Sequence, residues 1–299
     1  MRPLFLLTLA CITPLGSAEV KVEKIDYKGW PGSFRVTNGT IDVVVVPQVG
    51  RVMRYGYVDA PNVLWENETL LGKTFAANAR TYRNYGGDKI WVAPQSLWTW
   101  PPDPATDGKP WQVDAIANGV RMTSPVGNLQ KVQFRREITL SQAGSEVSFR
   151  NSMENKGSRM ELAIWQVTQV NNPDFVTLPF EITASQPKGW YGYGTESINA
   201  KFQSLSGGNL VIKRDPAIGR KFGARSLKGN LSAVIGATRF FSESPAFSRV
   251  PYPDKNSAQQ VYVSPDPYKY AELEHAGPLT RMEHGEMVLQ SVKWRLERG

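Results

Sequence analysis

Hydrophobic and polar residues alternate along much of this chain with the two-residue period that is typical of β-strands. Residues 132–140 carry on one face Val132, Phe134, Arg136, Ile138 and Leu140. Residues 147–153 carry on one face Val147, Phe149, Asn151 and Met153. Further strand-like segments span residues 39–47, 52–58, 161–170, 208–215, 259–266, 269–277 and 287–296. The pattern predicts a protein built mainly from β-strands.

Short turn signals, such as Asn38-Gly39 and Gly207-Gly208, separate these segments. No amphipathic pattern longer than about three helical turns interrupts them. Strands this numerous, joined by short turns, are typical of antiparallel sheets packed as a sandwich. Because no Pro- or Ser-rich linker divides the chain, the sequence predicts an all-β sandwich in a single domain over residues 19–299.

The first eighteen residues, MRPLFLLTLACITPLGSA, differ from the rest of the chain. One positive charge, Arg2, precedes an apolar run that ends in small residues at Ala18, which is the layout of a secretory signal peptide. The run is too short to cross a bilayer, which takes about 20 residues. We expect cleavage after Ala18 and a periplasmic or secreted mature protein without an integral membrane segment. The alternatives are a lipoprotein anchored through Cys11, whose preceding residues fit that pattern poorly, and a segment buried in the fold.

Residue composition narrows the chemistry of the mature chain. Cys11 is the only cysteine, so neither a disulfide framework nor a cysteine-based zinc site is expected. The two histidines, His275 and His284, do not have the spacing of metal ligands, and we expect no metal. The sequence has no G-x-S-x-G elbow and no Gly-rich phosphate loop in a strand–helix context, so no cofactor is expected.

The net charge is +8, or +7 once Arg2 is removed with the signal. Lys and Arg residues are scattered singly instead of forming a stripe, which argues against a nucleic-acid partner. A solvated basic surface is the simplest interpretation. The excess of positive charge would also favour an anionic ligand, such as an acidic sugar.

Residues 84–104, NYGGDKIWVAPQSLWTWPPDP, lack a regular period and yet contain three tryptophans, Trp91, Trp98 and Trp100. Indole rings have flat apolar faces with a polar edge. The C–H faces of sugar rings stack on such surfaces, so this loop is a candidate for a sugar-binding platform. The alternative is that the tryptophans close one end of the sandwich.

The same loop contains polar residues and glycines beside its tryptophans. Asp88 and Lys89 would supply hydrogen-bonding partners for sugar hydroxyl groups. Gly86 and Gly87 would let the backbone approach a ligand closely. These residue types strengthen the interpretation of the loop as a binding surface.

A second aromatic cluster, Trp190, Tyr191 and Tyr193, alternates with glycines in residues 187–197. Its chemistry matches that of the tryptophan loop, so the two clusters are candidates for the lining of one groove. The alternative is a glycine-rich hairpin with aromatic cross-strand pairs.

The segment YAELEHAGPL contains two glutamates, Glu272 and Glu274, two residues apart. On a strand, such residues point to the same face. If that face borders a pocket, repulsion between the carboxylates raises one pKa and makes that group a candidate general acid or base. The alternative is an ion pair with a basic residue such as Arg51, Arg83 or Lys89, which lowers the pKa of the glutamate.

Several of these pieces, in this order, resemble the galactose mutarotase-like superfamily. They are NGTIDVVVVPQVGRVMRYGY, NVLWEN, NYGGDKIWVAPQ with WPPDP, MENKG with LAIWQVTQV, and YAELEHAGPLTRMEHGE before KWRL. The combination of Gly-Gly, Trp and Trp-Pro-Pro-Asp is more specific than the first and last pieces. The resemblance covers nearly the whole mature chain and is strongest to a bacterial family of secreted or cytoplasmic proteins. It implies a large antiparallel β-supersandwich that binds carbohydrate.

Mutarotases of this superfamily use a histidine as general acid and a glutamate near the C-terminus as general base to open and reclose the sugar ring. The resemblance places Glu272 or Glu274 in the base role. The histidines do not carry over, because AIWQVTQV has none at the catalytic place and Asp88 stands near the place of the second. Without a histidine acid, we expect a pocket glutamate to pair with a basic residue and to accept hydrogen bonds from sugar hydroxyls.

The leading hypothesis is a secreted or periplasmic carbohydrate-binding protein of mutarotase-like fold. The alternative is a sugar-active enzyme, either an aldose 1-epimerase-like isomerase or a lyase or hydrolase, with Glu272 or Glu274 as the catalytic base. A third possibility is a structural module whose aromatic surface binds protein. The expected substrate-binding residues are Arg51, Arg83, Asp88, Lys89, Trp91, Trp98, Trp100 and Trp190.

Overall fold

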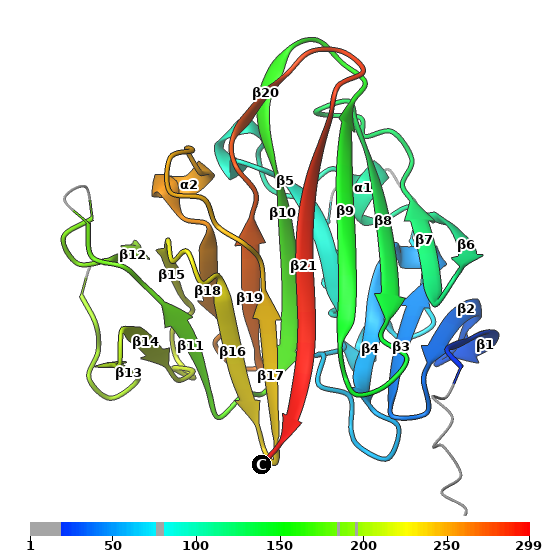
Figure 1. The fold of residues 1–299 in the computed structure, drawn as a ribbon, viewed down its shortest axis with the longest axis horizontal. Helices are drawn as coiled ribbons and strands as arrows, with labels where there is room; N and C mark the ends of the chain where they lie inside the picture. The colour runs from blue at the N-terminus through cyan, green and yellow to red at the C-terminus, as the bar shows by residue number, and fades with distance from the viewer. Residues whose placement is uncertain (1–18, 76–80, 184–185, 195–196) are drawn as a thin grey trace, which may run out of the picture.

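The computed structural model describes residues 19–75, 81–183, 186–194 and 197–299. The expected signal peptide, residues 1–18 with Cys11, lies outside the described residues. Its cleavage and the single domain over residues 19–299 therefore stay predictions. Within the described ranges, two antiparallel sheets lie face to face (Figure 1). This arrangement confirms the all-β sandwich that the alternating pattern predicts.

The first sheet has eleven strands in the described part of the chain. Ten lie side by side in the order β1 (Lys21–Tyr27), β2 (Trp30–Thr37), β3 (Ile41–Val46), β4 (Arg51–Tyr57), β5 (Asp88–Ala93), β10 (Met160–Asn171), β19 (Tyr270–Ala276), β18 (Gln259–Val263), β15 (Arg220–Ala224) and β12 (Trp190–Tyr193). The eleventh, β20 (Thr280–Met282), pairs with the first residues of β10. Strands distant in sequence thus meet at β10, which pairs with β5 on one side and β19 on the other.

The second sheet has ten strands among the described residues. Their order is β13 (Gln203–Ser206), β14 (Asn209–Ile212), β11 (Phe175–Pro179), β16 (Asn230–Ile235), β17 (Thr238–Glu243), β21 (Met287–Arg298), β9 (Val147–Asn155), β8 (Val132–Leu140), β7 (Gly119–Thr123) and β6 (Gln112–Ile116). The described helices are single turns, namely η1 (Pro47–Val49), η2 (Glu68–Leu70), η3 (Gln95–Leu97), α1 (Pro104–Asp107) and α2 (Pro253–Asn256).

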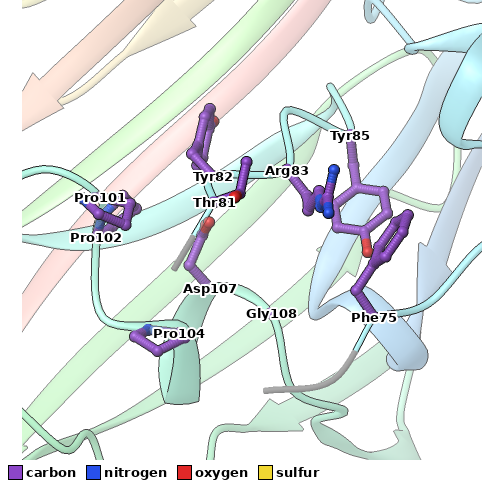
Figure 2. A pocket seen from close by; sticks show the side chains of 10 residues that line it. All are labelled: Phe75, Thr81, Tyr82, Arg83, Tyr85, Pro101, Pro102, Pro104, Asp107 and Gly108. Atoms are coloured by element: carbon purple, nitrogen blue, oxygen red, sulfur yellow. The ribbon is translucent and has the colours of Figure 1, made fainter. Parts of the chain in front are cut away.

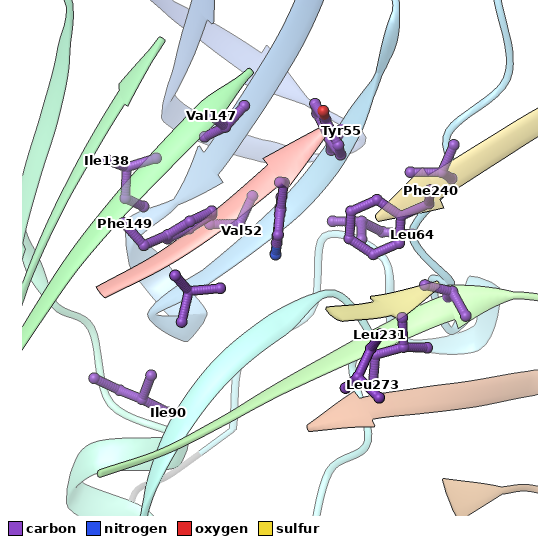
Figure 3. Packing of buried hydrophobic residues seen from close by; sticks show 14 of the residues in the cluster. Val52, Tyr55, Leu64, Ile90, Ile138, Val147, Phe149, Leu231, Phe240 and Leu273 are labelled. Atoms are coloured by element: carbon purple, nitrogen blue, oxygen red, sulfur yellow. The ribbon is translucent and has the colours of Figure 1, made fainter. Parts of the chain in front are cut away.

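The hydrophobic core fills the space between the two sheets (Figure 3). Trp294 of β21 lies among aromatic rings from both sheets, with its ring centroid 4.3 Å from that of Phe149 and 5.2 Å from that of Tyr55. Phe240 completes this group at 5.4 Å from Trp294. Full burial of one such side chain contributes on the order of 1.5–3 kcal/mol. Residues 19–299 contain no cysteine, so this core and not a disulfide stabilises the sandwich.

A buried polar cluster lies within this apolar layer. Arg136 is fully buried, and its guanidinium forms an ion pair with Asp88. The other carboxylate oxygen of Asp88 accepts hydrogen bonds from Gln166 Nε2 at 2.9 Å and from Thr168 Oγ1 at 2.8 Å. Arg136 Nε donates to Asn151 Oδ1 at 3.1 Å. The alternation predicts Arg136 and Asn151 on the buried face, and their mutual hydrogen bond offsets the cost of burying them.

Candidate functional site

The face of the first sheet that points away from the second sheet gathers charged and aromatic side chains. Because side chains alternate along a strand, Lys89 and Trp91 of β5 point away from the core between the sheets. Glu272 and Glu274 of β19 share this face, as their spacing predicts, and the leucine between them belongs to the core. Strand register places Trp165 of β10 directly opposite Trp91. Three adjacent strands therefore contribute to one surface.

A cavity of about 620 Å³ lies over this surface, which is within the size range of small-molecule sites. Its lining combines aromatic rings with a few charged and amide groups. The lining residues are Asn67, Thr69, Leu70, Tyr82, Arg83, Asn84, Trp91, Gln95, Trp100, Trp165, Lys221, Tyr262, Tyr268, Tyr270 and Glu272. Four residues singled out from the sequence therefore meet in this main cavity, namely Arg83, Trp91, Trp100 and Glu272.

The three tryptophans of the loop form one cluster at the edge of the main cavity. Trp91 and Trp98 are buried, whereas Trp100 is 54% exposed. The ring centroid of Trp91 lies 6.0 Å from that of Trp98 and 6.1 Å from that of Trp100, with the rings edge to face. The ring centroid of Tyr82 lies 4.6 Å from that of Trp100 and 6.1 Å from that of Trp91. Two tryptophans thus support the third, whose ring remains open to the cavity and to solvent.

Glu272 is the carboxylate that reaches the main cavity. Its side chain is 15% exposed, and its Oε1 accepts a hydrogen bond from Gln169 Nε2 at 3.0 Å. Lys89 Nζ lies 3.7 Å from the same oxygen and 4.9 Å from the centroid of the Trp91 ring. Burial lowers the pKa of Lys89 to about 8, although the charge of Glu272 opposes this change. Lys89 lies beneath the cavity lining, and its positive charge stabilises the carboxylate of Glu272.

Glu274 lies deeper than Glu272 and is fully buried. Its Oε2 accepts hydrogen bonds from Trp165 Nε1 at 2.8 Å and from Lys221 Nζ at 2.9 Å. Burial raises the pKa of Glu274 even though Lys221 opposes the shift. Loss of hydration outweighs the attraction of one lysine at Glu274, and the charge of Glu272 adds to the rise in its pKa.

Five of the eight residues expected to bind substrate lie outside the lining of the main cavity, namely Lys89 and Trp98, described above, and Asp88, Arg51 and Trp190. Asp88 points between the sheets toward Arg136, because it lies on the opposite face of β5 from Lys89. Arg51 is buried, and its Nη2 donates to Asp107 Oδ1 at 2.8 Å. Trp190 is buried and lines a separate cavity of about 200 Å³, so the two aromatic clusters border different cavities.

The glycine pair before β5 allows close packing of the backbone and not the approach of a ligand. Gly86 has a φ of +96°, and a Cβ atom there would lie 2.2 Å from the carbonyl oxygen of Trp65. Gly87 has a φ of +70°, and a Cβ atom there would lie 2.3 Å from the carbonyl oxygen of Val52. The pair lets the chain pass between β4 and the segment at Trp65 before it enters β5.

A second, smaller cavity of about 40 Å³ shares Tyr82 and Arg83 with the main cavity (Figure 2). Asp107 borders it, and its Oδ1 accepts a hydrogen bond from Trp91 Nε1 at 2.8 Å in addition to the bond from Arg51. Asp107 therefore anchors the indole that forms part of the main cavity.

Several cavity residues are not evident from sequence patterns. Trp165 lies in a strand that the sequence pattern predicts, so the side of the sheet to which it points could have been inferred from the sequence. Lys221 is an isolated lysine on β15, a strand that the sequence did not reveal. Tyr82, Tyr262 and Tyr270 reach the cavity from three different segments, and only the tertiary structure brings them together.

Two further structural features bear on the class of protein. Over the residues that the structure describes, every helix falls short of the length and apolar character needed to cross a membrane. The same residues contain no group of three or more His, Cys, Asp and Glu side chains arranged to hold a metal ion.

No protein-family model and no curated protein matches the sequence, but solved structures do match the fold. A galactose mutarotase-like protein from Clostridium acetobutylicum has a TM-score of 0.58 at 12% identity, over 94% of this chain and 99% of that chain. The fold is galactose mutarotase-like. A galactose mutarotase related enzyme from Lactobacillus acidophilus gives the galactose mutarotase-like fold again, with a TM-score of 0.55 at 10% identity over 89% of this chain and 97% of that chain.

A TPR-domain containing protein from Parabacteroides distasonis has a TM-score of 0.63 at 14% identity. The match covers 88% of this chain and 46% of that chain, so this chain spans less than half of that protein. The matches to mutarotase-like structures confirm the galactose mutarotase-like fold to which the sequence pieces point. At such low identities they show the fold alone.

Proposed function

We propose that the protein binds a carbohydrate in the main cavity. The observation that carries this proposal is the position of Trp100, a half-exposed indole held by two buried tryptophans at the edge of a polar cavity. An apolar ring face opposite hydrogen-bonding groups matches the two-sided chemistry of a sugar, which has C–H faces and hydroxyl edges. The galactose mutarotase-like fold supports the proposal by analogy.

The polar groups of the lining suit sugar hydroxyls. Glu272 offers a carboxylate acceptor, Lys221 and Arg83 offer charged donors, and Gln95 and Asn84 offer amides that both donate and accept. Glu272 and Lys221 lie on strands β19 and β15, which limits their loss of entropy on binding. The cavity is therefore suited to bind a sugar through several hydrogen bonds and one stacking contact.

Titration calorimetry with a panel of mono- and oligosaccharides tests the proposal. Trp100 exposes 54% of its surface, which is about 135 Å² of the roughly 250 Å² of an indole side chain. A sugar that covers half of this area removes about 70 Å² from water, worth about 1.7 kcal/mol or a roughly 20-fold change in Kd. Trp100→Ala should weaken binding by this factor. Phe247→Ala, at an equally exposed ring outside the cavity lining, is the matched control.

Acid–base chemistry on the bound sugar is the second candidate function. The observation that favours it is the pair of Glu272 and Lys89, because Glu272 reaches the cavity and burial brings the pKa of Lys89 to about 8. A general base and a general acid work best when their pKa values lie near the working pH. In this mechanism Glu272 would take the proton of the anomeric hydroxyl while the bond between C1 and the ring oxygen breaks, and the ring oxygen would take a proton from the ammonium group of Lys221. Lys89 would act through Glu272 as a positioning residue.

Polarimetry of freshly dissolved sugar anomers tests this second candidate. If the protein is a mutarotase, it accelerates the change in optical rotation, and Glu272→Gln removes the acceleration. A parent protein that binds sugar but leaves the rate unchanged acts in binding alone. We further propose that the protein works in the periplasm or outside the cell, on the strength of the signal-like residues 1–18.

A further inference from the structure

The charged groups at and beneath the main cavity can be sorted into pairs. Lys221 donates to Glu274 at 2.9 Å, and Lys89 lies 3.7 Å from Glu272. Each pair places one positive and one negative charge within reach of each other, so each is close to neutral as a unit.

The third pair lies behind Trp91. Arg51 is 1% exposed and donates to Asp107 at 2.8 Å. Together the three pairs contribute no net charge to the cavity. Lys89 Nζ and Arg51 Nε are buried without a hydrogen-bond partner, but each of the three cations has a carboxylate within 4.0 Å that balances its charge.

Arg83 is the cation that remains. It lines the main cavity and the smaller one beside it, and among the described residues no carboxylate lies within 4.0 Å of its guanidinium nitrogens. Its guanidinium carbon lies 4.1 Å from the centroid of the Phe75 ring. Its Nε is buried and has no hydrogen-bond partner in the described structure.

Stacking on Phe75 orients the guanidinium of Arg83. The N–H groups of a guanidinium lie in its own plane. When one face of the guanidinium stacks on an aromatic ring, these groups point sideways and remain available as donors. A partly buried and unsatisfied guanidinium costs free energy that an anionic partner recovers. The planar fork of arginine matches the two oxygens of a carboxylate or of a sulfate ester in a bidentate contact.

We propose that the ligand of the main cavity is a sugar that carries a single negative charge and that Arg83 binds this charged group. The inference rests on the proposed carbohydrate function and specifies its substrate class. One unpaired cation beside three neutral pairs selects one anionic group. A uronic acid and a sulfated sugar both present such a group, and the test below separates them.

Titration calorimetry with matched charged and neutral sugars tests the inference. The probes are glucose and galactose, their uronic acids, and their 6-sulfates. We expect a charged member to bind at least about tenfold more tightly than its neutral parent, as a charge-assisted bidentate contact implies. This preference should weaken between about 50 mM and about 500 mM NaCl, because salt screens exposed charges. The better of the two anion classes identifies the source of the charge.

Variants of Arg83 locate the preference. Arg83→Gln should abolish the advantage of the charged sugar, so that the charged sugar and its neutral parent bind this variant with similar Kd values. Arg83→Lys keeps the charge without the planar fork and should retain part of the preference. Arg150→Gln, on the outer face of the second sheet, is the matched control and should change neither affinity. Thermal unfolding of each variant verifies that it is folded.

The outcomes separate this inference from the function on which it rests. Equal binding of charged and neutral sugars, or a preference that survives in Arg83→Gln, overturns the inference and leaves carbohydrate binding intact. Absence of binding by every sugar, charged or neutral, overturns the proposed carbohydrate function and the inference together.

Discussion

Replacement of Asp88 by asparagine distinguishes a structural role from a ligand-binding role at this position. The carboxylate lies between the sheets and accepts hydrogen bonds from Arg136, Gln166 and Thr168. The asparagine side chain would keep the shape but leave the Arg136 guanidinium buried without a counter-charge. Removal of one partner from a buried ion pair costs about 3–5 kcal/mol. Because domains are stable by about 5–15 kcal/mol, this loss is a large share of the total.

Equilibrium unfolding in urea, followed by tryptophan fluorescence, measures this loss as a lower midpoint at unchanged slope. Asp59→Asn is the matched control, since Asp59 pairs with Arg298 at the surface, and it should not shift the midpoint measurably. The double variant Asp88→Leu with Arg136→Met should recover most of the stability, because apolar residues can replace a buried ion pair. A loss below about 1 kcal/mol in Asp88→Asn, or weaker sugar binding at unchanged stability, would refute the structural role.

Three further predictions concern other parts of the molecule. Burial lowers the pKa of His275 to about 4, whereas an unfolded histidine titrates near 6.5, so stability should fall by about 3 kcal/mol as the pH drops through this window; urea unfolding at several pH values should show a weaker dependence in His275→Asn. Gly87→Ala should cost more stability than Gly144→Ala in thermal unfolding, because both have positive φ but only Gly87 would clash with the carbonyl oxygen of Val52; equal losses would contradict the packing argument. Expression of the full chain should yield a periplasmic or secreted protein that begins at Glu19, and a mass that retains residues 1–18 would contradict the signal peptide.

The two-residue period of the sequence by itself determined the class of fold. Alternation over residues 132–140 and 147–153 placed Arg136 and Asn151 on a buried face, and both are buried there. The same rule placed Glu272 and Glu274 together on one face of a strand. These predictions succeed because side-chain direction along a strand is a local property, fixed by backbone geometry.

The site itself depended on information that no local pattern contains. Asp88 and Lys89 are neighbours in sequence, yet one joins Arg136 in the core and the other supports Glu272 beneath the cavity. Which residue takes which side depends on where β5 begins to pair, and a shift of one residue would exchange them.

Tertiary structure alone also decided which charges remain unpaired. Lys221 meets Glu274 from a distant segment of the chain, whereas Arg83 lies over the ring of Phe75 and forms no ion pair with a carboxylate among the described residues. The sequence determines how many charges of each sign exist, but Coulomb attraction and desolvation depend on distance and burial. The composition therefore suggested an anionic ligand in general terms, and only the packing of β5, β10, β15 and β19 singled out Arg83 as the group to receive it.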